Sequence, residues 1–208
     1  NRNGNFDIFK VQADGSGTVQ PLVTGPQNDW VPDWSQDGRH LVYFSEEKGQ
    51  LDIWMVSLDG DRKSVPLMET QHAELFPALS PDSRYVAYQS DESGRQEVYV
   101  MPFPDGGGKW LVGEGTNPKW SSNGKELFYE SEGSLMAVEV STQGVFSPGI
   151  PKTLFSEEQV KTNNIQIFNY DVSADGQRFV VVQNVDEGET PTITVVENWY
   201  SEFEDKEQ

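Results

Sequence analysis

A short turn phrase recurs four times along the chain and limits the kind of fold that the chain can adopt. Each copy places a serine two residues before an aspartate or asparagine, which is followed by a glycine in three copies and by a serine in the second. The copies begin at Trp34, Leu79, Trp120 and Val172, and their serines are spaced 45, 41 and 52 residues apart. A period of roughly 40–50 residues is typical of a repeat architecture, in which one supersecondary unit stacks on the next.

The residues around each copy predict β-strands. Short runs of β-branched and aromatic residues follow the phrase, as at 40–44 and 179–182, and Gly, Asp and Ser bound them. A third strand with an Asp-Ile-Trp type of pattern follows, as at 52–56, and then a short outer strand. About four antiparallel strands at this period indicate the blade of a β-propeller. One blade cannot bury both faces of its sheet, so we expect neighbouring blades to stack.

We expect one all-β propeller domain over residues 1–200, made of four-stranded antiparallel blades, about four and a half of which are present. The expected units are a partial blade at 1–25, blades at 26–70, 71–113, 114–156 and 157–200, and an acidic tail at 201–208.

Two arrangements of these blades stay open. The chain is either a truncated part of a larger propeller or a closed five-bladed ring, in which the first strands complete the last blade and no sheet edge stays exposed. The strand predicted at 193–196 already takes the third place in the last blade, where a closed ring would put 7–11. This overlap favours the truncated propeller.

Physical chemistry explains the residue types in the turn phrase and at the aromatic position of the third strand. The Asp or Asn side chain can accept hydrogen bonds from nearby backbone N–H groups, and Gly takes a positive φ at little steric cost. Ser83 stands in the place of that Gly, so we expect its turn to be strained or of another type. The aromatic residues Phe9, Trp54 and Tyr99 share one register in the third strand, where we expect them to pack between blades rather than stack on a ligand.

The composition excludes several classes of partner. The net charge is −19, from 34 acidic and 15 basic residues, which repels nucleic acid and anionic membranes. No apolar run approaches the roughly 20 residues of a membrane helix, so we expect no direct membrane insertion. The chain has no cysteine, and its paired carboxylates at 59–61 and 186–189 lack the spacing of a Ca²⁺ loop. We therefore expect neither a metal nor a cofactor.

Residues 76–88 and 31–39 resemble the WD-like repeat of TolB-type β-propellers. The likeness covers nearly the whole chain and is closest to the C-terminal propeller of bacterial serine/threonine protein kinases; it continues through 88–104, 124–129, 170–179 and 193–199. It implies a non-catalytic binding or sensing module of a larger bacterial protein, and it favours an extracytoplasmic or periplasmic location. The Gly-rich loop, the His-Arg-Asp loop and the Asp-Phe-Gly motif of kinases do not occur here.

An alternative function is the gating or regulatory propeller of a peptidase-type hydrolase, because related propellers occur in such enzymes. The chain itself has no Gly-x-Ser-x-Gly elbow, and only His40 and His72 could act as bases. We therefore expect no catalytic residue here, and any kinase or hydrolase activity would lie in a domain outside this chain.

The loops that lead from the outer strand of one blade to the inner strand of the next gather around the central opening of a propeller. Loops on a rigid scaffold are where binding residues concentrate. Here these loops carry an aromatic ring, carboxylates and amides. We therefore predict that they form a ligand-binding rim, which takes either a protein or peptide, including a basic one, or a small ligand. Two alternatives to a ligand-binding role stay open: His72 is a solvated loop residue, and Trp30 packs beneath its loop. The predicted rim residues are Asp29, Trp30, His72, Glu74, Asn117 and Asn163.

Overall fold

The secondary structure consists of β-strands throughout the part of the chain that the computed structural model describes. These residues are 4–47, 49–155, 170–181 and, for the backbone alone, 194–197. All described strand pairs are antiparallel, so the predicted all-β propeller fold is confirmed. Within these residues no helix is long and apolar enough to cross a membrane.

Five sheets follow one another along the described chain, each built from consecutive strands. The first sheet contains β1 (Ile8–Lys10) and β2 (Gln20–Val23). The second contains β3 (Asp29–Trp34), β4 (His40–Glu47), β5 (Gln50–Ser57) and β6 (Ser64–Met68). The third contains β7 (Glu74–Leu79), β8 (Tyr85–Ser90), β9 (Glu97–Pro102) and β10 (Trp110–Glu114).

The fourth and fifth sheets depart from the simple four-stranded order. The fourth contains β11 (Thr116–Trp120), β12 (Glu126–Ser131) and β13 (Ser134–Ser141), and β13 pairs with both β14 (Ser147–Pro148) and β15 (Lys152–Phe155). The fifth contains β16 (Tyr170–Val172), β17 (Arg178–Val181) and β18 (Thr194–Glu197). β18 lies beside β17, in the place that the closed-ring alternative gives to β1.

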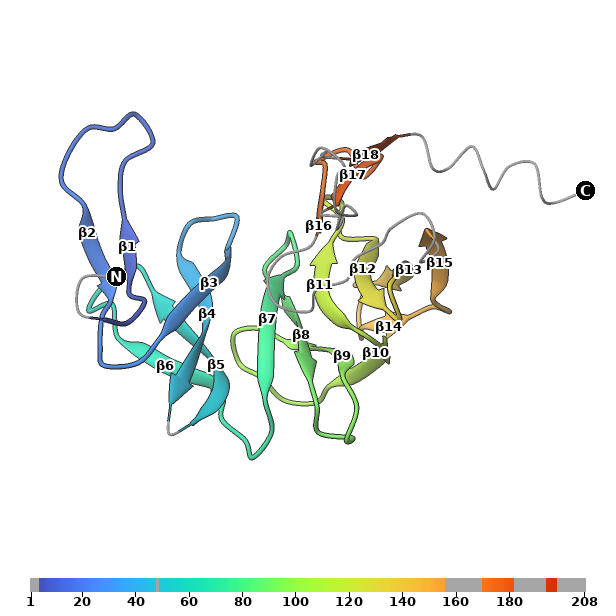
Figure 1. Cartoon of the computed structure of the whole chain (residues 1–208), viewed down its shortest axis with the longest axis horizontal. Helices are drawn as coiled ribbons and strands as arrows, with labels where there is room; N and C mark the ends of the chain where they lie inside the picture. The colour runs from blue at the N-terminus through green and yellow to red at the C-terminus, as the bar shows by residue number, and fades with distance from the viewer. Residues whose placement is uncertain (1–3, 48, 156–169, 182–193, 198–208) are drawn as a thin grey trace, which may run out of the picture.

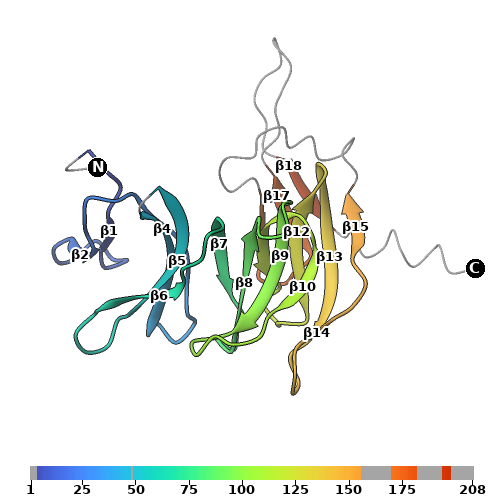
Figure 2. The same cartoon turned by 90° about the horizontal axis from the view of Figure 1, so that it is seen from below.

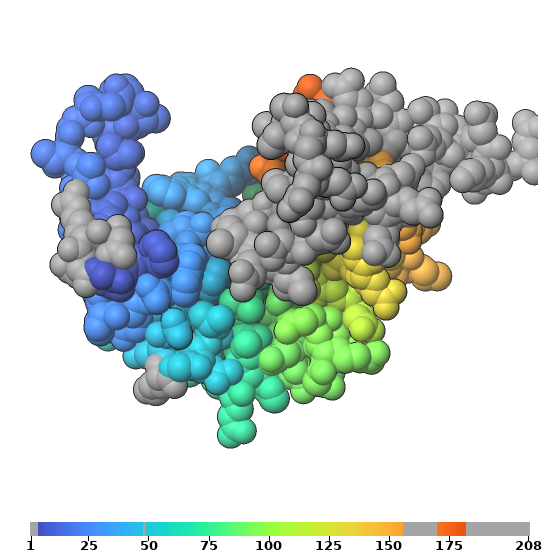
Figure 3. Space-filling model, in the orientation of Figure 1, coloured from blue at the N-terminus to red at the C-terminus, as the bar shows by residue number. Residues whose placement is uncertain are grey.

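The sheets stand side by side in chain order, like successive blades (Figures 1 and 2). Figure 3 shows the surface of the same arc, from the blue β1–β2 sheet at one end to the orange β15 at the other. The first strands of the second to fifth sheets lie on the inner side of the arc, where β7 is flanked by β3 and β11. The inner ends of the sheets therefore meet around a shared space.

Alternate residues of each strand face opposite neighbours, which places the hydrophobic core between the sheets. On β8, Tyr88 packs toward the second sheet and Ala87 toward the fourth. Of the aromatic residues in the third strands, Tyr99 is buried and stacks on Tyr88 with ring centroids 5.8 Å apart, and Trp54 packs against the cluster between the first and second sheets. Phe9 is 36% exposed. Trp54 and Tyr99, whose sheets have a neighbour on each side, therefore pack between sheets as expected.

The four turn phrases form the same hydrogen bonds. The Ser35 hydroxyl donates to Asp37 Oδ1 at 2.7 Å, Asp37 Oδ1 also accepts from the Arg39 N–H at 3.0 Å, and the Gly38 N–H donates to the Ser35 carbonyl at 2.8 Å. The bond from the Ser35 hydroxyl is the main reason why the pKa of Asp37 lies below its usual value. Equivalent bonds recur at Ser80–Asp82, Ser121–Asn123 and Ser173–Asp175.

Ser83 adopts the turn of its glycine counterparts, with φ at +54° against +70° at Gly38 and +68° at Gly124. This left-handed conformation costs an L-residue about 1–2 kcal/mol. The substitution Ser83→Gly removes that cost but adds chain entropy to the unfolded state. We therefore expect Ser83→Gly to raise the free energy of unfolding by about 0.5–1 kcal/mol, measured by urea denaturation. The reciprocal change Gly124→Ser should lower it, and equal signs for the two would contradict this account.

Candidate functional site

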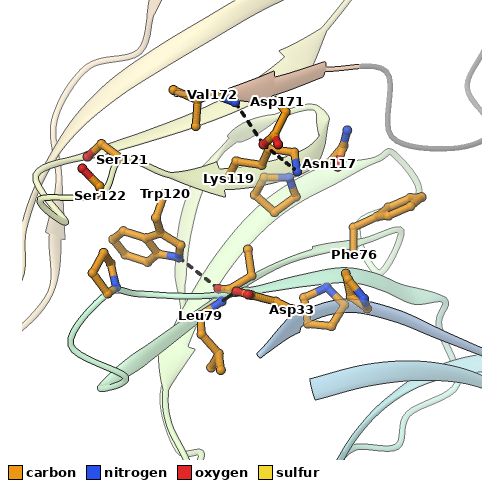
Figure 4. A pocket seen from close by; sticks show the side chains of 15 residues that line it. Asp33, Phe76, Leu79, Asn117, Lys119, Trp120, Ser121, Ser122, Asp171 and Val172 are labelled. Atoms are coloured by element: carbon orange, nitrogen blue, oxygen red, sulfur yellow. Dashed lines mark hydrogen bonds and ion pairs between the residues drawn. The ribbon is translucent and has the colours of Figure 1, made fainter. Parts of the chain in front are cut away.

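A pocket of about 370 Å³ lies where the first strands of the second to fifth sheets meet. Figure 4 shows Trp120 and Phe76 on opposite sides of this central pocket, with Asp33 below and Asp171 and Lys119 above. The walls combine aromatic and proline rings with three charged side chains. These residues come from β3, β7, β11 and β16, so the pocket depends on the arrangement of four sheets.

A β-bulge before the turn phrase shapes each of the first three inner strands. The pairing register shifts between Trp30 and Asp33, and the two following sheets repeat the shift before Ala78 and Lys119. A proline lies in each bulge, at Pro32, Pro77 and Pro118, where its missing N–H is tolerated because these are edge strands. A bulge redirects the side chain that follows it. Asp33, Ala78 and Lys119 all line the central pocket.

Two residues directly before these prolines have left-handed backbone conformations, at φ +50° for Phe76 and +53° for Asn117. Asparagine adopts this region readily, whereas a bulky aromatic residue there is an outlier that the surrounding structure must hold in place. Such outliers cluster at ligand-binding sites. Both residues line the central pocket.

The charged and polar groups of the pocket join neighbouring sheets. Asp33 accepts the Leu79 N–H through Oδ2 at 2.6 Å and the Trp34 N–H through Oδ1 at 2.7 Å. Burial raises the pKa of Asp33, and these two hydrogen bonds and the Lys119 charge oppose that rise. Lys119 Nζ lies 3.4 Å from Asp171 Oδ1, whose side chain is 76% exposed. The Asp171 carboxylate is therefore open to a ligand, while Asp33 holds β3 against β7.

The charged side chains in the pocket lining are those of Asp33, Lys119 and Asp171. The lining contains neither His nor Cys, and the Ser121 hydroxyl donates to Asn123 Oδ1 at 3.0 Å and accepts the Glu126 N–H at 2.9 Å. Ser121 thus serves the turn. In the described segments of the chain, no three His, Cys, Asp or Glu side chains are grouped to hold a metal. The arrangement suits the binding of a ligand with apolar and charged parts.

Three of the six predicted rim residues are buried. Asp29 is 7% and Glu74 1% exposed, and burial raises the pKa of both carboxyl groups. Glu74 Oε1 accepts the Thr70 hydroxyl at 2.7 Å. Asn117 is buried too, and of the five predicted rim residues that the structure describes it alone lines the central pocket.

The other three predicted rim residues differ in their surroundings. Trp30 is half-buried and stacks on Phe44 with ring centroids 5.2 Å apart, which matches the packing alternative. The His72 side chain is 45% exposed, with Nδ1 3.9 Å from Asp91 Oδ1. Asn163 lies outside the described residues. A ligand-binding role for the six residues stays a prediction.

The sequence analysis missed Asp33, Lys119 and Asp171. They share one place in the repeat, directly before the hydrophobic residue of the turn phrase, where the second copy has Ala78. Aligning the copies on their serines would have shown that this inner-strand position changes charge from unit to unit.

Successive four-stranded antiparallel sheets that meet around a central pocket define a β-propeller. The chain belongs to PD40, the TolB beta propeller domain family, whose model matches residues 31–182. A comparison with curated protein sequences finds no match.

Solved structures show the same fold at low sequence identity. TolB from Acinetobacter baumannii is 17% identical with a TM-score of 0.66, over 89% of this chain and 45% of its own. A puromycin-hydrolyzing peptidase from Mycobacterium tuberculosis is 17% identical with a TM-score of 0.53, over 87% of this chain and 30% of its own. An oligogalacturonate lyase in complex with manganese is 11% identical with a TM-score of 0.59, over 92% of this chain and 54% of its own. The chain spans about half the length of the TolB structures that it matches.

Proposed function

We propose that the chain is a non-catalytic binding module of a larger bacterial protein and that its central pocket takes a polypeptide segment with a basic side chain. The observation that supports this most directly is the exposed Asp171 carboxylate in a pocket whose walls include the rings of Phe76 and Trp120. An apolar wall with a few placed charges is typical of a binding site. The family and its TolB relatives support an extracytoplasmic location for the module.

Charge favours a basic ligand over an acidic one. The chain carries a net charge of −19, a field that attracts cations and speeds their association. In the pocket, the one Lys faces two Asp residues, Asp33 and Asp171. A Lys or Arg side chain entering the pocket would balance this excess.

Binding of defined peptides tests the proposal. We expect decapeptides with a central Lys or Arg to bind more tightly than matched peptides with Glu or norleucine there, measured by fluorescence anisotropy. Asp171→Asn should weaken the basic peptides by about three- to fivefold, because exposed ion pairs contribute up to about 1 kcal/mol. Asp61→Asn removes an exposed carboxylate elsewhere and should leave the affinity unchanged. Equal affinity for all peptides, or no effect of Asp171→Asn, would contradict the proposal.

The role of a gating propeller in a peptidase-type hydrolase stays the alternative. Its support is the fold that the chain shares with the propellers of peptidases, at identities that show the fold alone. A hydrolase domain in the full-length polypeptide would favour it over the binding module.

A further inference from the structure

The second and third sheets are equivalent residue by residue, with a constant offset of 45. Trp54 pairs with Tyr43 and Pro66, and Tyr99 pairs with Tyr88 and Leu111 in the same register. The offset is the same on either side of each connecting loop, so equivalent residues are separated by equal stretches of chain in the two sheets. The gap between the first and second sheets can therefore be compared, position by position, with the next gap, which lies between the second and third sheets.

A cavity of about 200 Å³ lies in the first of these gaps, between the β1–β2 sheet and the second sheet. Its lining includes the carboxylates of Asp29 and Glu47, the rings of Tyr43 and Trp54, and the hydroxyl of Ser64. Among the described residues that line it, none is Lys or Arg. The cavity lies apart from the central pocket and shares no lining residue with it.

The equivalent place in the next gap contains an ammonium group. Glu92 and Tyr99 correspond to Glu47 and Trp54, and Lys109 corresponds to Ser64. Lys109 Nζ lies 4.9 Å from the centroid of the Tyr99 ring and forms an ion pair with Glu92. The first gap thus retains the carboxylate and the aromatic ring but has a short hydroxyl in place of the amine.

A second difference between the two gaps concerns the buried carboxylate. In the next gap, the Thr70 hydroxyl donates to Glu74 at 2.7 Å. The equivalent residues of the first gap are Gly25, which has no side chain, and Asp29, which is one methylene shorter. Burial raises the pKa of Asp29, the nearby Asp7 charge raises it further, and a hydrogen bond from Ser45 opposes both. A cation at this position would relieve the cost of burying the Asp29 charge.

We propose that the cavity between the first two sheets binds an alkylammonium group, which takes the place that Lys109 occupies in the next gap. Carboxylates and aromatic rings together are the usual environment for an ammonium ligand. A cavity of 150 Å³ holds benzene, so about 200 Å³ accommodates a butyl chain with its amine. The amine is a lysine side chain of a partner polypeptide or a free small amine, since the recognised chemistry is the same.

Titration with defined probes tests this site in the intact chain. We expect n-butylammonium and Nα-acetyl-lysine amide to bind saturably and to shift the indole NMR signal of Trp54, while 1-pentanol, a neutral analogue, binds about tenfold more weakly. Binding of the lysine derivative alone would identify a polypeptide as the source, and binding of both would show that the free amine suffices. Binding of neither, or equal binding of 1-pentanol, would overturn the proposal.

Two variants locate the site. Ser64→Lys installs the equivalent of Lys109 and should weaken n-butylammonium at least tenfold, whereas Thr18→Lys adds the same charge on an exposed loop and should not. Asp29→Asn keeps the shape of the cavity, removes its buried charge and should weaken the amine about tenfold as well. Unchanged affinity in Asp29→Asn would reject the site even if Ser64→Lys failed to fold. The Asp171→Asn variant of the central pocket should leave amine binding intact, which separates this proposal from the function proposed above.

Discussion

Replacing Phe146 with alanine is expected to lower the free energy of unfolding by about 3–4 kcal/mol, in the range of large-to-small changes at buried aromatic residues. Phe146 is 1% exposed, and its ring centroid lies 5.5 Å from that of Tyr85, 5.4 Å from Trp110 and 6.2 Å from Trp120. These partners belong to the third and fourth sheets. Removing the ring would therefore leave a cavity between two blades that cannot collapse without moving one of them.

The segment that carries Phe146 is an arm of the fourth sheet that reaches over the third. It leaves β13 and returns through β14, and the third sheet holds it by two hydrogen bonds. Arg84 Nη2 donates to the Thr142 carbonyl at 2.8 Å, and the Tyr85 hydroxyl donates to the Gly144 carbonyl at 3.0 Å. Phe146 is the apolar anchor of this arm, so its loss should weaken the junction between the two blades.

Urea denaturation of Phe146→Ala, followed by circular dichroism, measures this effect. Val145→Ala is the matched control, because Val145 is the neighbouring residue and is 74% exposed, and a change within about 0.5 kcal/mol is expected there. Amide hydrogen exchange of residues 142–149 should also increase in Phe146→Ala. A loss below about 1 kcal/mol would show that the arm does not stabilise the junction.

The repeated local patterns made the strands and turns predictable from the sequence. The turn phrase fixes a hydrogen-bonded tight turn within six residues, and the strands on either side alternate toward two neighbouring sheets. Ser83 illustrates how local this information is, because the turn keeps its shape although its glycine is missing. Both outcomes expected for this turn, strain or another turn type, follow from the residues of the turn alone.

Features that depend on contacts between sheets could not be predicted in the same way. In the described parts of the other units the arm around Phe146 has no counterpart, so comparing the units with one another does not reveal it. Asp29 and Glu74 have the charge of surface residues, yet both are buried. Asp33, Lys119 and Asp171 meet in the central pocket because four inner strands converge there, which the sequence of one unit does not show.

The same comparison of units explains why one glycine cannot be replaced. Five residues before the hydrophobic residue of the turn phrase, two sheets carry the buried carboxylates Asp29 and Glu74, but the fourth sheet has Gly115. A Cβ atom at this glycine would lie 2.5 Å from Cδ2 of Tyr129 and 2.3 Å from the Glu130 carbonyl oxygen. The Tyr129 ring, which is buried, therefore occupies the space that a side chain would need.

Gly115→Ala is accordingly expected to lower the free energy of unfolding by about 3 kcal/mol, at the upper end of overpacking costs, because one of the clashing atoms belongs to the backbone. Thermal and urea unfolding measure the loss, and Gly108→Ala is the control, since its Cβ would meet no atom within 4 Å. Combining Gly115→Ala with Tyr129→Phe should restore little stability, because the ring carbon and the Glu130 carbonyl both stay in place. Full recovery in that double variant would show that the tyrosine hydroxyl, rather than the close approach of ring and backbone, requires glycine at this position.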